Sequence, residues 1–129
     1  MAQSNVEAIQ ALYRAFLKRE LMTILSLVDS GIEIRVSEML PWGGTYEGLG
    51  GLKDFFTKLL DHLDSKVDFT EWIESGDSVV AIGRSHGTVK ANGNTFDIPI
   101  VHVWHLRDGK AVLFEPYVDT AGMLKALGK

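Results

Sequence analysis

The sequence contains no cysteine. Disulfide bonds, thiolate catalysis and cysteine-based metal sites are therefore excluded. The absence of cysteine does not distinguish a reducing from an oxidising compartment, because it fits either side of a membrane. No stretch approaches about 18 consecutive apolar residues, and the N-terminus lacks the basic start and apolar run of a signal peptide. These absences predict a soluble, cytoplasmic protein without a membrane partner.

Basic residues are few and scattered, with 13 Lys and Arg against 17 Asp and Glu and a formal net charge of -4. Nucleic-acid binding requires clustered Lys and Arg, so we expect no nucleic-acid partner. The four histidines show no metal-ligand spacing such as HExxH, which predicts no metal site. The glycine-rich segment 38–51 matches neither a phosphate loop nor a dinucleotide fingerprint, and we expect no cofactor.

The length and composition indicate one folded domain that spans residues 1–129. A chain of 129 residues that is 46% hydrophobic and 23% charged has ordinary globular usage and is too short for two typical domains.

Ser4 and Glu7 have the spacing of a capping box and predict the start of a first helix. A short second helix is predicted up to Val28, where the glycine of "DSG" would end it, and a third over 52–64, where apolar residues recur at helical spacing.

The second half of the chain changes to a period of two. Strands are predicted over 32–36, 67–73, 79–90, 95–107 and 110–118, and segment 38–51 is predicted to be an irregular loop. Asn92-Gly93 and Asp108-Gly109 are strong hairpin signals. This order predicts an α+β fold: a conical barrel of a strongly curved antiparallel sheet, covered by three N-terminal helices, with a short C-terminal helix that Asp119 or Thr120 would cap.

One face of the strand over 95–107 is apolar apart from a single histidine, His102. A two-residue turn at Asp108-Gly109 would pair His102 with Glu115, and the hairpin at Asn92-Gly93 would place small residues, Gly83 and Ser85, around the histidine and leave a hollow. A three-residue turn with a glycine bulge would instead shift the register by one. His102 would then face Phe114, and Glu115 would lie on the other surface.

A carboxylate beside a partly buried histidine stabilises the imidazolium and fixes the ring tautomer. In the first register His102 would titrate near neutral pH and act as a general acid or base. The alternative is a core histidine that is hydrogen-bonded to backbone or water. Arg84 and His86 are expected on the opposite face from His102. The candidate pocket also includes Tyr13, Trp42, Ile100, Trp104 and Tyr117.

The element order, the loop "LPWGGTYEGLGGLKDFF" and the ending "VHVWHLRDGKAVLFEPYVDT" resemble the SnoaL-like branch of the nuclear transport factor 2-like superfamily, which includes ketosteroid isomerases and polyketide cyclases. The resemblance covers the whole chain and implies a conical α+β barrel that is homodimeric through its outer sheet face. His102 stands where those enzymes carry an essential aspartate, and Tyr13 matches the isomerase tyrosine.

The resemblance does not extend to the catalytic residues of these enzymes. The second isomerase aspartate falls on or near Val36, and the Asp, Arg, Asp set of limonene-epoxide hydrolases is not recognisable, so neither known mechanism is supported. The first hypothesis is that the protein is an enzyme, namely an isomerase, cyclase or hydrolase that acts on a small hydrophobic molecule. His102 would be its acid or base, and Glu115 would orient His102. The alternatives are a non-catalytic binding module and an interaction subunit that uses the outer face of Val101, Val103 and His105.

Overall fold

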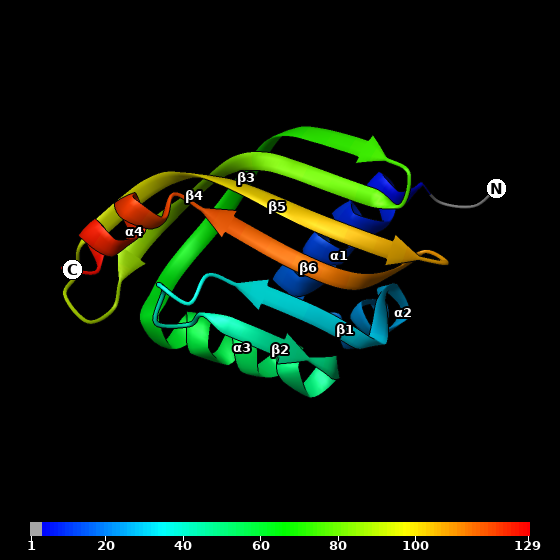
Figure 1. Ribbon diagram of the computed structural model, residues 1–129, viewed down its shortest axis with the longest axis horizontal. Coiled ribbons are helices and arrows are strands. Elements are labelled where there is room, and N and C mark those ends of the chain that lie inside the picture. The colour runs from blue at the N-terminus through cyan, green and yellow to red at the C-terminus, as the bar shows by residue number, and fades with distance from the viewer. Residues whose placement is uncertain (1–3) are drawn as a thin grey trace.

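A computed structural model describes residues 4–129, which form four helices and one six-stranded sheet (Figure 1). The elements in chain order are α1 (Asn5–Lys18), α2 (Leu21–Leu27), β1 (Val28–Val36), β2 (Gly44–Glu47), α3 (Gly48–His62), β3 (Leu63–Ser75), β4 (Ser78–Val89), β5 (Thr95–Arg107), β6 (Lys110–Val118) and α4 (Thr120–Ala126).

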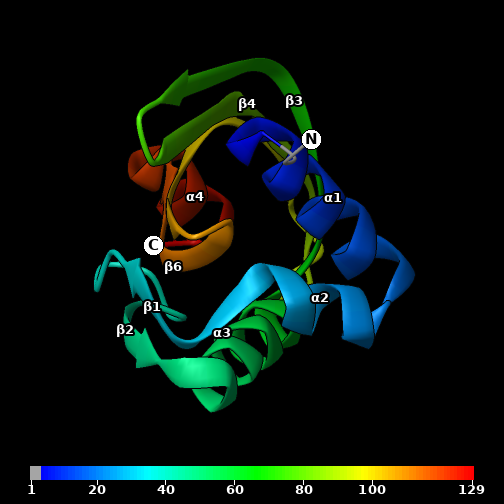
Figure 2. The ribbon, with the colours of Figure 1, turned by 90° about the vertical axis from the view of Figure 1, so that its right-hand side faces the viewer.

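The strands lie in the order β2-β1-β6-β5-β4-β3, and the curved sheet has α1, α2 and α3 along its open side (Figure 2). The helices and the sheet share one hydrophobic core. Leu12 of α1 and Phe55 of α3 belong to the same core as Trp104 of β5. The two edge strands, β2 and β3, do not pair with each other, so the cone is open along one side. The α+β cone that the sequence predicts is confirmed.

Local signals explain where the helices begin. The Ser4 side chain accepts a hydrogen bond from the backbone N–H of Glu7 and caps α1, and Asp119 likewise caps α4 by accepting from the N–H of Gly122. The third helix begins at Gly48, four residues before the apolar repeat on which its prediction rested. None of the helices in residues 4–129 combines the length and the hydropathy needed to span a membrane.

Three expectations about the strands are wrong. The first strand begins at Val28, directly after α2, so the "DSG" segment lies inside β1. The segment 38–51 contains a short strand, β2, that pairs with β1. The sheet is mixed, because β1 runs parallel to β6. A pairing between strands so far apart in the chain leaves no turn signal for the sequence to show.

Glycines in β4 allow the sheet to bend sharply toward β3. A Cβ atom built on Gly83 would lie 1.9 Å from the carbonyl oxygen of Asp68, and one on Gly87 would lie 2.1 Å from that of Asp64. Any larger residue would clash with the β3 backbone. The space that the sequence assigned to a hollow at these glycines is therefore occupied by β3.

The hairpin between β5 and β6 has the expected turn but an unexpected register. Asp108 and Gly109 both have positive φ, 52° and 76°, and Arg107 pairs with Lys110, as a two-residue turn requires. The register then shifts, because Leu106 pairs with Ala111 but His105 pairs with Leu113. Val112 is the extra residue of a β-bulge, and every later residue of β6 lies on the face opposite to the one predicted.

The hairpin between β4 and β5 is shifted by two positions from its prediction. Phe96 pairs with Gly87 instead of Val89, and His102 pairs with Ala81 instead of Gly83. A shift of two leaves each side chain on its expected face, because the side chains of a strand alternate with a period of two. The predicted inner face of β5 is therefore correct although the pairs are not.

Candidate functional site

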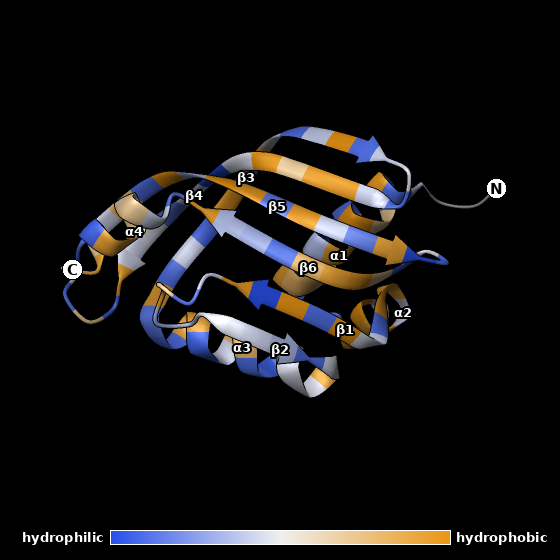
Figure 3. Ribbon diagram, viewed as in Figure 1, coloured by the Kyte–Doolittle hydropathy of each residue, from blue (hydrophilic) through white to orange (hydrophobic). Residues whose placement is uncertain are grey.

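The inner face of β5 carries the candidate site. Its six inward side chains are each 9% exposed or less, and they alternate with more exposed residues along the strand. Bands of hydrophobic and hydrophilic residues follow one another along β5 (Figure 3). They are Phe96, Ile98, Ile100, His102, Trp104 and Leu106. Among residues 4–129, the buried polar residues are His102 and Ser85. A buried imidazole requires a hydrogen-bond partner, and the structure provides one from α1.

Three side chains form a chain of hydrogen bonds that links β5 to α1. The indole Nε1–H of Trp104 donates to the phenol oxygen of Tyr13 at 2.9 Å, and this oxygen lies 2.6 Å from Nδ1 of His102. An indole N–H can only donate, so the phenol oxygen accepts from Trp104 and its proton is available for Nδ1. The neutral His102 ring therefore carries its own proton on Nε2.

Burial keeps both Tyr13 and His102 in their neutral forms. Desolvation lowers the pKa of His102 from 6.5 to about 3, because the charged imidazolium loses its water and gains no carboxylate. Desolvation also raises the pKa of the Tyr13 phenol, against the opposing effect of the hydrogen bond from Trp104. At neutral pH the pair is a phenol and an uncharged imidazole.

The second ring nitrogen of His102 has no hydrogen-bond partner in the part of the chain that the structure describes. Every fully buried side-chain nitrogen or oxygen within residues 4–129 has a hydrogen-bond partner, whereas the hydrogen bond found for the His102 ring involves only Nδ1. Nε2 is therefore not completely covered, although His102 as a whole is only 9% exposed. Its N–H is the free end of the hydrogen-bonded chain.

Aromatic rings surround the imidazole. The ring centroids of Phe114 and Phe69 lie 5.2 Å and 5.3 Å from that of His102 in edge-on orientations, and Tyr13 lies 6.0 Å away in a stacked one. Trp104 in turn stacks on Phe114 at 3.9 Å. These contacts create an apolar environment that favours flat, apolar partners over charged ones.

Glu115 does not lie beside His102. Because of the bulge at Val112, Glu115 pairs with Val103 on the outer face, and His102 pairs with Pro116. The predicted contact between His102 and Glu115 is therefore wrong, and so is the expectation that His102 titrates near neutral pH. The alternative register correctly placed Glu115 on the other surface, but it located the irregularity in the turn instead of in β6.

The other predicted pocket residues divide between two faces. Ile100 and Trp104 point inward and are 1% exposed. Trp42 is also buried, but its ring packs against His62 at the end of α3, with a centroid distance of 5.7 Å. Tyr117 is 53% exposed on the outer face, where it pairs with Val101, and its assignment to the pocket is wrong.

Arg84 and His86 lie on the outer face, as expected. The Arg84 guanidinium contacts Asp97 at 2.7 Å, and Nε2 of His86 contacts Asp68 at the same distance. Both pairs are largely exposed, and exposed ion pairs of this kind contribute little to stability. Within residues 4–129, no group of three His, Asp or Glu side chains is close enough to hold a metal ion.

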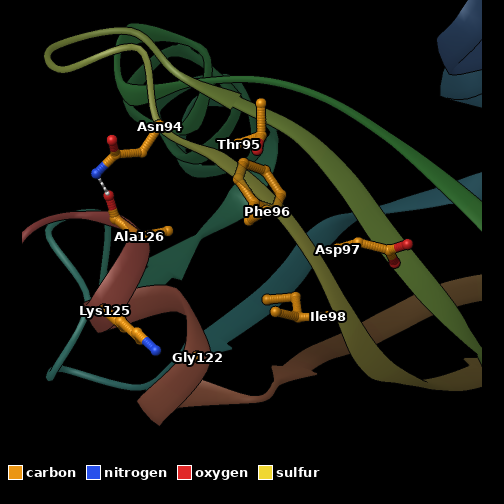
Figure 4. Close-up of a pocket in the computed structure, with 8 residues that line it drawn as sticks. All are labelled: Asn94, Thr95, Phe96, Asp97, Ile98, Gly122, Lys125 and Ala126. Carbon is orange, nitrogen blue, oxygen red and sulfur yellow. Dashed lines mark hydrogen bonds between the residues drawn. The ribbon is translucent and has the colours of Figure 1, made fainter.

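Two shallow hollows lie away from His102. The larger, of about 370 Å³, lies between α4 and the start of β5, where Lys125 and Asp97 are among its lining residues (Figure 4). The other, of about 290 Å³, lies between β3 and β4 beside His86. Neither has a buried polar side chain that would fix the orientation of a ligand.

Sequence reasoning missed the hydrogen bonds among Trp104, Tyr13 and His102, although it named all three residues. The periodicity of α1 and β5 shows that each side chain points inward, but it does not show how far one element lies from the other. Phe69 was also missed. It lies opposite Gly83, and that glycine was the available signal, because a residue without a side chain lets the β3 backbone at Phe69 approach closely.

The sequence pattern of the SnoaL-like domain matches residues 9–114. No protein of curated function matches the chain. Among solved structures, an NTF2-like protein of unknown function from Burkholderia pseudomallei is 28% identical, with a TM-score of 0.88, over 99% of this chain and 100% of that one. TerC, crystallised with polyporic acid, is 32% identical, with a TM-score of 0.85, over 97% of this chain and 98% of that one.

A more distant structure shares the fold. IdmH from Streptomyces antibioticus, a candidate polyketide cyclase, is 22% identical, with a TM-score of 0.74, over 98% of this chain and 100% of that one. The domain match covers most of the chain and includes both Tyr13 and His102. The chain belongs to the SnoaL-like family of the nuclear transport factor 2-like superfamily.

Proposed function

We propose that the protein binds a small, flat and mostly apolar molecule inside the cone, and that the Nε2–H of His102 donates a hydrogen bond to an oxygen of that molecule. The observation that carries this proposal is the chain of hydrogen bonds from Trp104 through Tyr13 to Nδ1 of His102. It orients the imidazole and leaves its second N–H as a fixed donor in an apolar environment, where a hydrogen bond to a developing negative charge is strongest.

The reaction class that fits this donor is the isomerisation or cyclisation of a carbonyl compound. In such reactions negative charge develops on an oxygen as a carbon–hydrogen bond is broken or a carbon–carbon bond forms. The pKa of about 3 keeps the His102 ring neutral at neutral pH. A neutral imidazole is a very weak acid, so its N–H stabilises the charge on that oxygen by a hydrogen bond without transferring the proton. One preorganised donor of this kind contributes on the order of 10² to 10³ in rate.

His102 is not assigned the role of the base in any of these reactions. A histidine whose conjugate acid has a pKa of about 3 is a poor base at neutral pH, whether the proton comes from carbon or from water. No carboxylate within residues 4–129 is hydrogen-bonded to His102. His102 therefore fits the role of an electrophilic donor better than the acid or base role that its sequence position suggests.

The related protein TerC supports a flat aromatic ligand, since it was crystallised with polyporic acid and is 32% identical to this chain. Polyporic acid is a dihydroxyquinone that carries two phenyl rings. Its quinone oxygens are hydrogen-bond acceptors, and its rings are of the kind that would pack against Phe69, Phe114 and Tyr13. A molecule of this type matches both the donor and the walls of the site.

The test uses polyporic acid as the probe. Its binding is followed by the fluorescence of the tryptophans in the wild type and in His102→Phe, and by the nitrogen NMR signals of His102 in the wild type. We expect the Nε2 signal to shift on binding and His102→Phe to weaken binding at least tenfold. His86→Gln, a change at an outer-face histidine, is the control that should bind normally. Equal binding by His102→Phe, or an unshifted Nε2 signal, would overturn the proposal.

A second candidate function is that of a dimeric interaction module. The observation that favours it is the close aromatic packing around His102, together with the partly exposed apolar residues Val101 and Val103 on the outer face. A second copy of this chain would cover those residues. Analytical ultracentrifugation tests it: we expect a dimer for the wild type and a monomer for Val103→Glu. A monomeric wild type would exclude this candidate.

A further inference from the structure

Ser85 is the second buried polar residue of the inner face, and the hydrogen-bonded chain around His102 does not include it. It lies on β4, pairs with Ile98 of β5, and is 8% exposed. Its hydroxyl has no hydrogen-bond partner within residues 4–129, although every fully buried side-chain nitrogen or oxygen in this range has one. The Ser85 oxygen is therefore not completely covered, and its capacity to form hydrogen bonds is unused.

The inner face beside Ser85 is only partly covered. Val67 of β3 pairs with Ser85, and Phe69 pairs with Gly83. Directly opposed residues share one face of a sheet, so both side chains point to the inside of the cone. Val67 is nonetheless 38% exposed, and Ser65 and Phe69 on the same face are partly exposed as well. These three inward residues of β3 form a strip that the helices leave accessible.

This strip connects Ser85 to His102. The centroid of the Phe69 ring lies 5.3 Å from that of His102, and Val67 is the next inward residue of β3 toward Ser85. Ile98, the partner of Ser85, precedes His102 by four residues on β5, which corresponds to about 13 Å along an extended strand. Two unpartnered polar groups therefore lie at the ends of an apolar surface. Their separation is longer than one six-membered ring and fits a ligand of two linked rings.

We propose that Ser85 is a specificity-determining residue, which recognises a phenol hydroxyl at the far end of an elongated aromatic ligand whose first ring is held by His102. This inference rests on the proposed function and extends it to a second contact. A serine hydroxyl both donates and accepts hydrogen bonds, as a phenol does. The distal ring of the ligand would lie over Val67, and its hydroxyl would reach Ser85. A few placed polar groups in an apolar site fix the orientation of a ligand.

The experiment compares two probes by tryptophan fluorescence: polyporic acid, and the analogue that carries a hydroxyl at the para position of each phenyl ring. We expect the wild type to bind the analogue roughly two- to tenfold more tightly, which is the gain from one added hydrogen bond. Ser85→Ala removes only the hydroxyl and should bind the two probes with similar affinity. Equal binding of both probes by the wild type, or an unchanged preference in Ser85→Ala, would overturn the proposal.

Ser78→Ala is the matched control, because it removes a hydroxyl from the outer face of the same strand. It should keep the preference of the wild type, and its loss there would show that the preference does not come from Ser85. Methyl NMR locates the distal ring. We expect the Val67 signals to shift when the analogue binds and those of Val103, on the outer face, to stay in place. Unshifted Val67 signals would contradict the proposed position of the ring.

The two proposals for the inner face fail in different ways. If neither probe bound, or if His102→Phe bound both as the wild type does, the proposed function would be wrong and this inference would fall with it. If both probes required His102 but bound with equal affinity, the proposed function would stand, and only the assignment of Ser85 would be overturned.

Discussion

Two histidines on one strand have opposite environments, although they lie three positions apart in β5. His102 points into the cone, is 9% exposed, and is hydrogen-bonded to a buried phenol. His105 points outward, between the hydroxyl of Ser78 and the carboxylate of Glu115. The residue type is the same and the strand is the same. The face of the strand decides which of them is held neutral by burial and which has a carboxylate beside it.

The faces of β6 are set by the bulge at Val112, and the largest expected effect tests them. The bulge turns Phe114 into the core, where it is 3% exposed, and turns Leu113 outward. In a register without the bulge the two side chains would exchange faces. Truncating a buried phenylalanine costs about 3–5 kcal/mol. We expect Phe114→Ala to be unfolded or to lose about this much of its free energy of unfolding in urea titrations.

Leu113→Ala is the matched control. Leu113 pairs with His105 on the outer face and is only partly buried. We expect a loss of about 1 kcal/mol or less. If Leu113→Ala cost as much as Phe114→Ala, the bulge would not determine which side chains of β6 enter the core.

This bulge also marks the limit of what the sequence could predict. Periodicity placed His102 and Trp104 on the inner face correctly, and Asp108-Gly109 gave the right turn, because both signals are local. Nothing in "KAVLFEPY" shows that Val112 is an extra residue, since a bulge depends on how the sheet coils against its neighbours. The error at Val112 then produced the errors at Glu115 and Tyr117, and through them the wrong pKa for His102.

The parallel pairing of β1 with β6 was missed for a related reason. Hairpin signals report on neighbours in the chain, whereas Ile34 of β1 pairs with Phe114 of β6 across the whole domain. The inner site also depends on a distant contact, between Tyr13 and His102. The resemblance to a known family placed Tyr13 and His102 in one candidate site, but it supplied neither the parallel pairing nor the hydrogen bonds.

The neutral state of His102 predicts a specific dependence of stability on pH. Its pKa is about 3 in the folded protein and 6.5 when unfolded, so the unfolded state binds more protons between these values. The stabilisation is fully present above pH 6.5 and is lost as the pH falls toward 3, with a slope of up to about 1.4 kcal/mol per pH unit. His102→Gln should remove this part of the slope, as measured by urea unfolding at a series of pH values.

The matched control is His86→Gln, which changes a histidine on the outer face. It should leave the slope between pH 3 and 6.5 nearly as it is in the wild type, because an exposed ion pair contributes little. The interpretation of His102 would be wrong if His102→Gln and the wild type had parallel stability curves over this range.

Two tyrosines sharpen the comparison between the faces. Tyr13→Phe leaves the indole N–H of Trp104 without its acceptor and Nδ1 of His102 without its donor, and we expect a loss of about 1–3 kcal/mol. Tyr117→Phe removes an exposed hydroxyl that is bonded to Glu115, and we expect a change within about 0.5 kcal/mol. Nitrogen NMR should also show that His102 loses its fixed tautomer in Tyr13→Phe only. Equal losses for the two variants would contradict this assignment.

The smallest expected effect comes from Glu115→Gln. The glutamine can still accept the hydrogen bond of Tyr117, and a partly exposed pair with His105 contributes about 0–1 kcal/mol. The variant nevertheless distinguishes the two registers of the hairpin. If Glu115 lay beside His102, its loss would change the part of the pH slope that His102→Gln removes. Because Glu115 lies on the outer face, we expect that part of the slope to stay unchanged.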